Sequence, residues 1–388
     1  HDSADRYREL GVECLFGDAR VRSPWEVTLT RSPGQEELNL TARRLVIATG
    51  AEPVVPDIPG LAAEKFFTSA TVWSLEELPS RLLVIGGGPV GCELAQAFSR
   101  LGSKVTLVER EGRLLIHEEP AASALMLEQF LHEGLDVHLG ATVLAVSQDL
   151  DGDRATLQSG ERVWDVGFDK ILVALGRRAR VSGAGLDALG LGQTEDGTLQ
   201  VDDWMRTSNP LVHAAGDVAT RDRFTHVAAA MGWSAACNAL LGALWPMRVR
   251  TTDLPRSVYT DPEIARVGPS LEQLRQSGLE VEVTRYSLDE FDRAIIEDRR
   301  EGFVQIITAR GRDVILGATV AGPRASDLVS LFALAIRYRL GMRKILATTF
   351  PYPAWSSAAS AVSGQWQRDR APVRLLQMLE RWHAWRRD

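Results

Sequence analysis

Cysteine is scarce in this sequence of 388 residues, which contains only Cys14, Cys92 and Cys237. They lie far apart and form no CxxC pair, which excludes a disulfide scaffold and the common zinc-binding motifs and favours a reducing cytoplasm. No uncharged apolar run reaches the roughly eighteen residues of a transmembrane helix. A basic excess is also missing, because the formal net charge is −7. A nucleic-acid partner is therefore not expected.

The composition is otherwise that of a globular protein, with 45% hydrophobic and 24% charged residues. This length is sufficient for two or three domains with a large core. The sequence has no HExxH motif and no GxSxG motif, which argues against a zinc hydrolase or a serine hydrolase. We therefore expect no metal site.

A glycine-rich turn follows a predicted strand at residues 81–85. Gly86, Gly88 and Gly91 form the pattern GxGxxG, in which the glycines allow a tight turn, the approach of a pyrophosphate and close packing of helix against strand. Pro89 and Val90 belong to the same predicted cofactor-binding turn. The residues that we expect on one packed face of the following helix are Val90, Leu94, Ala97, Phe98 and Leu101.

An acidic residue ends the next predicted strand, residues 104–109. Glu109 follows Gly86 by 23 residues, close to the spacing of about 20 at which an acid binds the ribose hydroxyls of a dinucleotide. A glycine turn that only served packing would not require this acid. Glu109 favours NAD over NADP, because a 2′-phosphate would meet like charge. Arg110 and Arg113 weaken this preference, since either could pair with such a phosphate.

Two similar apolar strings, Leu45 to Gly50 and Ile171 to Gly176, indicate strands buried on both faces. A third string, residues 209–222, ends its apolar part on Gly216 and Asp217. Ligands bind beyond the carboxyl ends of such strands, so the Asp217 carboxylate is placed to accept hydrogen bonds from a ligand hydroxyl. The alternative is that Asp217 caps the next turn.

The composition of the sequence changes at residues 251–268, where a segment that contains proline indicates a domain boundary. Beyond it, three predicted strands and a helix at residues 326–338 indicate an antiparallel α+β domain. The three strand segments are EVEVTRYSL, GFVQIIT and DVILGATVAG.

Six segments in this order resemble the FAD-dependent pyridine nucleotide disulfide oxidoreductases, the family of dihydrolipoamide dehydrogenase, glutathione reductase and mercuric reductase. The resemblance covers about residues 1–365, and several ordered motifs are more specific than any single one. Within the family, GGGPVGCELAQAF and FPYP look closest to mercuric reductase-like members. The six segments are LVIATG, GGGPVGCELAQAF, ILVALGRR, AAGDVA, THVA and YTDPEIARVG.

The resemblance implies an α/β fold with two Rossmann-like domains, for FAD and for an inserted NAD(P), plus a C-terminal α+β dimerisation domain that makes the protein a homodimer. The predicted divisions are residues 1–72 and 179–250 for the FAD domain, 73–178 for the NAD(P) domain, 251–365 for the dimerisation domain and 366–388 for a basic amphipathic tail.

The resemblance also implies FAD and NAD(P)H as cofactors, with NADH favoured. A hydride would pass from the nicotinamide to the flavin and the electrons on to a disulfide or a soft metal ion. Pro89 stands where some members have a tyrosine over the nicotinamide. The residues that would border the cofactors are Ala48, Thr49, Gly50, Gly176, Ala215, Gly216 and Asp217.

Two residues are candidates for catalysis by resemblance. Glu93 matches the family glutamate near the nicotinamide, although an acid at a helix start is also favoured by the helix dipole alone. Tyr352 stands where thiol-reducing members have a histidine, and Ser357 where they have its glutamate. Tyrosine, with a reference pKa near 10, is a poor proton shuttle for thiols at neutral pH. It occurs here in mercuric reductases, but Tyr352 could equally only pack at the dimer interface.

Two other functions remain open. The chain lacks the family's redox pair CxxxxC and the terminal cysteine pair that would transfer a soft metal ion. A flavin reductase that passes electrons to a protein such as ferredoxin would need neither. A redox-inactive nucleotide-binding protein would also fit the replaced histidine and glutamate.

The tail at residues 366–388 places Leu375, Met378, Leu379 and Trp382 on one helical face with arginines around them. This pattern is typical of a helix that lies on a membrane surface. It is equally typical of a terminal helix that docks on its own domain, which we expect more often.

The family's second GxGxxG, for the FAD pyrophosphate, is absent from the sequence, so we expect it upstream of His1 in a longer protein. The 388-residue chain is then predicted to purify without flavin absorbance and without NADH oxidation by disulfide or mercuric acceptors, while it still binds NAD. Absorbance spectra and a nucleotide titration check this. Stoichiometric FAD on the chain would contradict our assignment of Gly86 to NAD.

Overall fold

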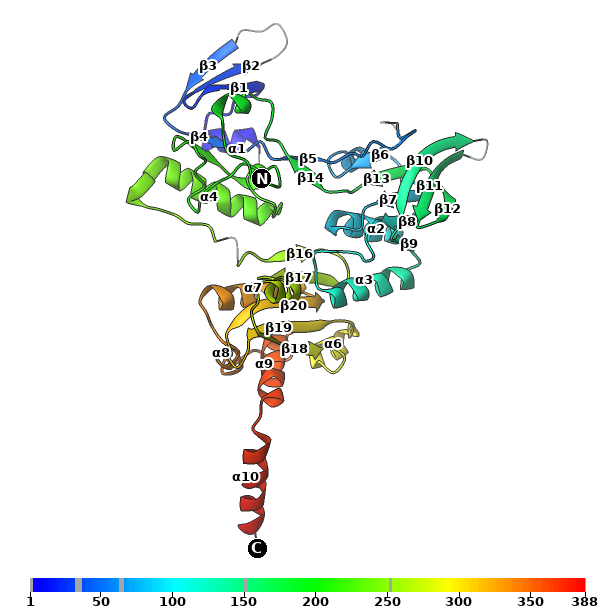
Figure 1. The fold of residues 1–388 in the computed structure, drawn as a ribbon, viewed down its shortest axis with the longest axis vertical. Coiled ribbons are helices and arrows are strands. Elements are labelled where there is room, and N and C mark those ends of the chain that lie inside the picture. The colour runs from blue at the N-terminus through cyan, green and yellow to red at the C-terminus, as the bar shows by residue number, and fades with distance from the viewer. Residues whose placement is uncertain (1–2, 32–36, 63–65, 150–151, 251–252, 388) are drawn as a thin grey trace. The chain divides into compact units, whose positions relative to one another are not determined.

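The computed structural model describes residues 3–31, 37–62, 66–149, 152–250 and 253–387 (Figure 1). The chain divides into two compact units. Unit 1 comprises residues 1–52 and 177–250, and unit 2 comprises residues 53–176 and 251–388. The predicted boundary at residue 251 lies outside the described residues, and the predicted domain limits stay predictions.

Unit 1 contains a short helix, α1 (Ala4–Glu9), and an antiparallel sheet in the order β1-β2-β3. Its strands are β1 (Asp18–Ser23), β2 (Glu26–Thr30) and β3 (Glu37–Thr41). A second sheet pairs β4 (Leu45–Ile47) with β15 (Val212–Ala214) in parallel, and α4 (Thr225–Leu241) contacts both strands. The parallel pairing brings the ends of β4 and β15 side by side.

The prediction that Leu45 to Gly50 form a strand buried on both faces is wrong for most of the segment. Ile47 is buried, but Leu45 is only half-buried and Val46 is 44% exposed. The reason is that the described part of this sheet has only two strands, which leaves one face of β4 uncovered. The matching prediction for Ile171 to Gly176 is confirmed for residues 171–173, which are buried in a five-stranded sheet, but not for Leu175, which lies beyond the end of β13 and is exposed.

That five-stranded sheet of unit 2 is parallel throughout, in the order β6-β13-β7-β8-β9. Continuous apolar strands suit a sheet covered on both faces. The bounds are β6 (Phe66–Thr68), β7 (Arg81–Ile85), β8 (Lys104–Glu109), β9 (Asp136–Leu139) and β13 (Lys170–Val173), with the helices α2 (Pro89–Leu101) and α3 (Pro120–His132) between them.

The predicted packed face of α2 is confirmed in part, because Leu94 and Phe98 pack against the core while Val90 is 38% and Leu101 67% exposed. The most deeply buried side chains of the helix are Cys92 and Ala95, with Gln96 nearly as buried. The small side chains of Cys92 and Ala95 let the helix approach the sheet closely. The helix ends at Gly102, whose left-handed conformation has φ 111°.

A separate antiparallel sheet lies between β9 and β13 along the chain. It consists of β10 (Thr142–Asp149), β11 (Gly152–Ser159) and β12 (Arg162–Phe168). Its buried side chains, among them Ala155, Leu157 and Phe168, share a hydrophobic cluster with Leu83 and Ile171 of the parallel sheet. The antiparallel sheet therefore extends the core of unit 2.

The C-terminal part of unit 2 is an antiparallel sheet in the order β16-β17-β20-β19-β18, as predicted from its alternating segments. Its strands are β16 (Arg256–Val258), β17 (Glu263–Val267), β18 (Val281–Ser287), β19 (Phe303–Ala309) and β20 (Ile315–Gly322). The helices are α5 (Leu271–Gln276), α6 (Asp292–Glu297), α7 (Ala325–Arg337), α8 (Met342–Leu346) and α9 (Ala358–Asp369).

The last helix, α10 (Val373–Trp385), does not dock on its own domain, in contrast to our expectation. All its described side chains, from residue 376 onward, are exposed. The predicted position Leu375 lies outside the described side chains. Among the described residues, no helix combines the length and hydropathy that spanning a membrane requires.

A buried ion pair joins the segment before α3 to the C-terminal sheet of unit 2. Arg266 Nε on β17 lies 2.9 Å from Glu118 Oε2, and the two side chains are only 3% and 9% exposed. The other guanidinium nitrogens donate to the carbonyl oxygens of Gly268 and His117. Removing one partner of such a pair leaves an uncompensated buried charge.

We predict that Glu118→Ala lowers the free energy of unfolding by about 3–5 kcal/mol, because Arg266 stays charged and buried. The matched control is Glu280→Ala, which breaks the exposed pair with Arg310 and is expected to cost at most about 1 kcal/mol. Urea denaturation of the three proteins compares them. Equal losses for both variants would contradict this assessment.

Candidate functional site

The glycine turn between β7 and α2 leaves no space for side chains on its inner side. A Cβ atom on Gly91 would lie 1.9 Å from the carbonyl oxygen of Gly86, and a Cβ on Gly86, at φ 111°, would lie 2.5 Å from that of Ala174. Gly88, the N-cap of α2, has no atom within 4 Å of its Cβ position. The turn is thus closed toward the sheet and open outward at Gly88. This open cradle at a helix N-terminus fits a pyrophosphate.

Pro89 is the first residue of α2, where its missing N–H costs nothing, and Val90 follows it partly exposed. Cys92, one turn on, donates its thiol hydrogen to the carbonyl oxygen of Gly87. Burial, followed by the charges of Glu109 and Glu93, raises the pKa of the Cys92 thiol well above its usual range. This cysteine therefore supports the turn and is not a redox group.

Glu109, at the end of β8, reaches back over the glycine turn. Its Oε2 accepts the N–H of Gly87 at 2.6 Å and its Oε1 accepts the N–H of Glu111 at 2.8 Å. A carboxylate has about four acceptor positions, so two remain for ribose hydroxyls. Its position at the strand end is the one that the sequence predicted.

The two neighbouring arginines differ in their freedom. Arg113 donates to the carbonyl oxygens of Glu118 and Ile116 and to the hydroxyl of Ser123, so its guanidinium is committed. Arg110 makes only an exposed pair with Glu111. Of the two, only Arg110 is placed to turn toward a 2′-phosphate.

The Glu93 carboxylate accepts the backbone N–H of Tyr259, which precedes β17, at 2.8 Å. Burial raises the pKa of Glu93, and the hydrogen bond from Tyr259 opposes this effect. The carboxylate is therefore held by the C-terminal part of unit 2 and not merely solvated at a helix start.

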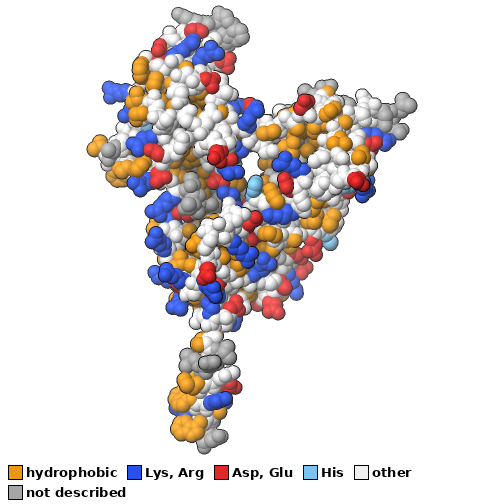
Figure 2. Space-filling view, viewed as in Figure 1, with side chains coloured by type: hydrophobic (Ala, Val, Ile, Leu, Met, Phe, Trp, Pro, Cys, Tyr) orange, Lys and Arg blue, Asp and Glu red, His pale blue; other side chains and the backbone are white. Residues whose placement is uncertain are grey.

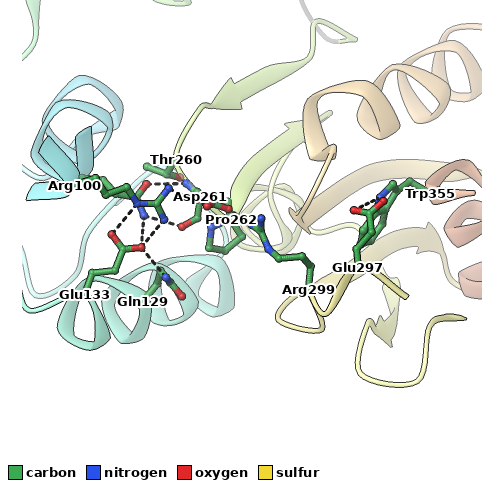
Figure 3. Close-up of polar contacts among 10 residues, drawn as sticks. Arg100, Gln129, Glu133, Thr260, Asp261, Pro262, Glu297, Arg299 and Trp355 are labelled. Carbon is green, nitrogen blue, oxygen red and sulfur yellow. Dashed lines mark hydrogen bonds and ion pairs between the residues drawn. The ribbon is translucent and has the colours of Figure 1, made fainter. Parts of the chain in front are cut away.

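Gln96, one turn further along α2, fixes the same backbone segment. Its Oε1 accepts the N–H of Asp261 and its Nε2 donates to the carbonyl oxygen of Asp261, both at 2.7 Å. The Asp261 side chain pairs in turn with Arg100 and Arg299 (Figure 3). Arg100 and Gln129 also bind Glu133. We call Gln96 together with residues 259–261 the clamp. The hydrogen bonds of Gln96 to Asp261 fix the backbone segment whose Tyr259 N–H binds the Glu93 carboxylate.

The predicted flavin-side residues follow the ends of β4 and β15, which the parallel pairing of Ile47 with Ala214 places side by side. Gly50 and Gly216 both have positive φ, 71° and 77°. Thr49 donates its hydroxyl hydrogen to the carbonyl oxygen of Arg180. Ala48 and Ala215 directly follow the strands, so the fold brings together the segments 48–50 and 215–217.

The Asp217 carboxylate is mostly buried and lies 2.9 Å from Arg177 Nη1. Arg177 also donates to the carbonyl oxygen of Ala51. Sequence reasoning assigned no role to Arg177, although it directly follows Gly176 in the segment ILVALGRR. The signal was Asp217, an acid expected at the end of a buried strand. Such a carboxylate needs a basic partner, which could have indicated Arg177. Gly176 itself, at φ 96°, accepts the N–H of Val54.

Tyr352 is 74% exposed, and Ser357 donates to the carbonyl oxygen of Ala354 at the start of α9. The structure therefore does not bring Tyr352 and Ser357 together as a hydrogen-bonded pair in the described contacts. The hydrogen bond and negative charge of Asp292 raise the pKa of the Tyr352 phenol, so it stays protonated at neutral pH.

Comparison with known proteins defines the class. Residues 4–232 match the pyridine nucleotide-disulphide oxidoreductases and residues 254–362 match the dimerisation domain of the same group. The chain therefore belongs to the pyridine nucleotide-disulphide oxidoreductase family, a family of enzymes that use FAD and NAD(P)H. The family, the mixed α/β fold class and the cofactors predicted from the sequence are thereby confirmed.

Mercuric reductases are among the similar proteins. The protein of Streptomyces lividans is 38% identical over 374 residues, which are 95% of this chain and 78% of the relative. That of Acidithiobacillus ferrooxidans is 36% identical over 343 residues, and the match covers 88% of this chain but only 61% of the relative. A dihydrolipoyl dehydrogenase of Chlamydia muridarum is 33% identical over 358 residues, 91% of this chain and 75% of that protein.

Solved structures agree with this assignment. LpdA from Mycobacterium tuberculosis has a TM-score of 0.82 at 26% identity, covering 92% of this chain and 78% of its own. The flavoprotein disulfide reductase RclA from Escherichia coli, in a Cu(II) complex, has a TM-score of 0.79 at 25% identity, covering 90% of this chain and 78% of its own.

Within the residues described, no group of three or more His, Cys, Asp or Glu side chains is arranged to hold a metal ion.

We predict that Glu109→Ala weakens NADH binding by about 1–3 kcal/mol, because hydrogen bonds from ribose hydroxyls to a charged acceptor are lost. NADPH binding should change less or improve, since the like charge is removed. Calorimetric titration of both nucleotides measures this, with the exposed Glu128→Ala of α3 as control. Equal losses for NADH and NADPH would mean that Glu109 only supports the turn through Gly87.

Proposed function

We propose that the protein is a mercuric reductase-like flavoenzyme that takes hydride from NADH and delivers electrons to a soft metal ion, in the cytoplasm. The observation that carries this proposal is the open glycine cradle with the Glu93 carboxylate one turn into the same helix. The 38% identity to a mercuric reductase supports the choice of acceptor. The predicted domain divisions at residues 1–72, 73–178, 179–250 and 251–365 are part of the proposal.

Each predicted site residue has a separate role in this proposal. Gly86, Gly88 and Gly91 hold the pyrophosphate of the nucleotide against the N-terminus of α2, and Glu109 binds the adenosine ribose. NADH is preferred because Glu109 repels a 2′-phosphate and because Arg113, committed to its loop, cannot offset that repulsion. Arg110, which pairs with Glu111, weakens the preference if it turns toward such a phosphate. The chemistry that a bound FAD would supply is acceptance of a hydride from NADH and transfer of electrons to the acceptor.

Glu93 orients the nicotinamide end of the nucleotide. Ionisation of this half-buried carboxyl is disfavoured in the folded protein, as its raised pKa indicates, and the clamp limits its movement. On the flavin side, Asp217 accepts a hydrogen bond from a ribityl hydroxyl, while the ion pair with Arg177 holds the carboxylate in place. The second glycine turn for the FAD pyrophosphate is not among these 388 residues.

A metal ion is a better acceptor for this site than a disulfide. Reduction of a disulfide requires a group that gives a proton to the leaving thiolate near neutral pH. The Tyr352 phenol, with its pKa raised by Asp292, holds its proton too firmly for that exchange. Its exposure places it at a surface, consistent with a homodimer in which it faces the partner subunit.

The test is an acceptor assay with NADH on protein that carries FAD, since the 388 residues alone are predicted to purify without flavin and without this activity. We expect NADH oxidation that depends on Hg(II) and exceeds that with oxidised lipoamide by roughly tenfold or more. Tyr352→Phe should lower turnover with Hg(II) and leave flavin reduction by NADH in a single turnover unchanged. Faster turnover with lipoamide would contradict the proposal.

Two further outcomes favour the alternatives. Turnover only with ferricyanide, a one-electron acceptor, would select the reductase that serves a protein such as ferredoxin. Nucleotide binding without turnover of any acceptor would select the redox-inactive protein.

Glu93→Gln tests the role of Glu93 at the nicotinamide. This variant should slow flavin reduction by NADH roughly tenfold or more. The free energy of unfolding of this variant at neutral pH should not fall. Ionisation of a carboxyl whose pKa is raised by folding destabilises the folded state, and the substitution removes that ionisation.

A further inference from the structure

The helix α10 presents an unusual surface for the end of an acidic protein. Its exposed apolar side chains are large, with Trp385 at 74%, Met378 at 60%, Leu376 at 50%, Trp382 at 46% and Leu379 at 40% exposure. Figure 2 shows apolar side chains along one side of this segment. Helices that cover a core bury such residues, so this one has a different partner.

Four of these apolar side chains form one continuous face, which leaves out Leu376. At 100° per residue, Met378, Leu379, Trp382 and Trp385 fall within an arc of about 120°. Arg381 borders the arc on one side. Arg386 falls inside the arc, and its guanidinium lies 4.8 Å from the Trp382 ring centroid. We call the four apolar residues with Arg381 and Arg386 the tail face.

The charge of this segment is opposite to that of the rest of the chain. Residues 371–388 contain four arginines and two acidic side chains, which gives this segment a formal charge of +2. Because the net charge of the chain is −7, the remaining residues together carry −9. The preceding helix α9 is anchored, because Arg370 pairs with Glu282 and stacks on Trp366. Ala371 and Pro372 then separate the helix α10 from this anchored end.

We propose that the tail face binds the surface of an anionic lipid bilayer. Tryptophan favours the boundary between headgroups and acyl chains, where its ring is apolar and its N–H stays hydrated. The arginine stems lie along the apolar face and direct their charges to lipid phosphates. The helix lies parallel to the surface and does not cross the bilayer, for which no described helix is suited.

A second copy of the chain is a poorer occupant of the tail face. Pairing two identical α10 helices would bring their arginines together at the borders of the contact, at a cost in repulsion. The acidic remainder of the chain is repelled by anionic lipid, so the tail is the part that can approach such a surface.

The experiment is sedimentation of the full chain with vesicles of phosphatidylcholine, with and without phosphatidylglycerol. We expect binding to the anionic vesicles that weakens as salt rises. Trp382→Ser with Trp385→Ser should lower the partition coefficient roughly tenfold or more, and Arg381→Glu with Arg386→Glu by a similar factor. Trp233→Ser, at an exposed tryptophan of α4, is the matched control and should bind like the unaltered chain.

Three results would overturn the proposal. Equal binding to neutral and anionic vesicles would remove the electrostatic part of it. Unchanged binding of the Trp382→Ser, Trp385→Ser variant would place the contact elsewhere on the chain. Absence of vesicle binding, together with a smaller oligomer for that variant in light scattering, would identify a second copy as the occupant.

Discussion

The close approach of α2 to β7 is the constraint on which the candidate nucleotide site depends. A Cβ atom at Gly91 would lie 1.9 Å from the carbonyl oxygen of Gly86, so the helix can begin where it does only with glycine there. This approach also favours small side chains on the packed face, as at the fully buried Ala95. The position of the helix start then determines where Glu93 lies.

The three candidate carboxylates are held by three different means. Glu109 accepts backbone N–H groups of its own turn and its own loop, Glu93 accepts one from the C-terminal part of unit 2, and Asp217 pairs with Arg177. At Glu93, burial raises the pKa and the hydrogen bond from Tyr259 opposes this effect. We infer that this half-buried carboxylate lies near the reacting ring, whereas Glu109 and Asp217 bind hydroxyls.

The sequence predicts those features that local patterns determine. The strand, glycine turn, helix and terminal acid at residues 81–109 were predictable because each step has its own local requirement. The packed face of α2 was predictable only in part, since hydrophobicity alone ranks Leu101 above Gln96, and only the contact with Asp261 explains a buried amide. Arg177 was missed for the same reason: its partner Asp217 is 40 residues away in the sequence.

Hydrogen exchange of the 388-residue chain, with and without saturating NADH, tests the central claim most directly. The claim is that the cradle at residues 86–91 and the acid at the end of β8 hold the nucleotide. The account predicts slower exchange of backbone amides in residues 86–92 and 109–113 when NADH is bound, because these amides face the pyrophosphate and ribose. Protection confined to residues 214–218, or none in either segment at saturation, would contradict it.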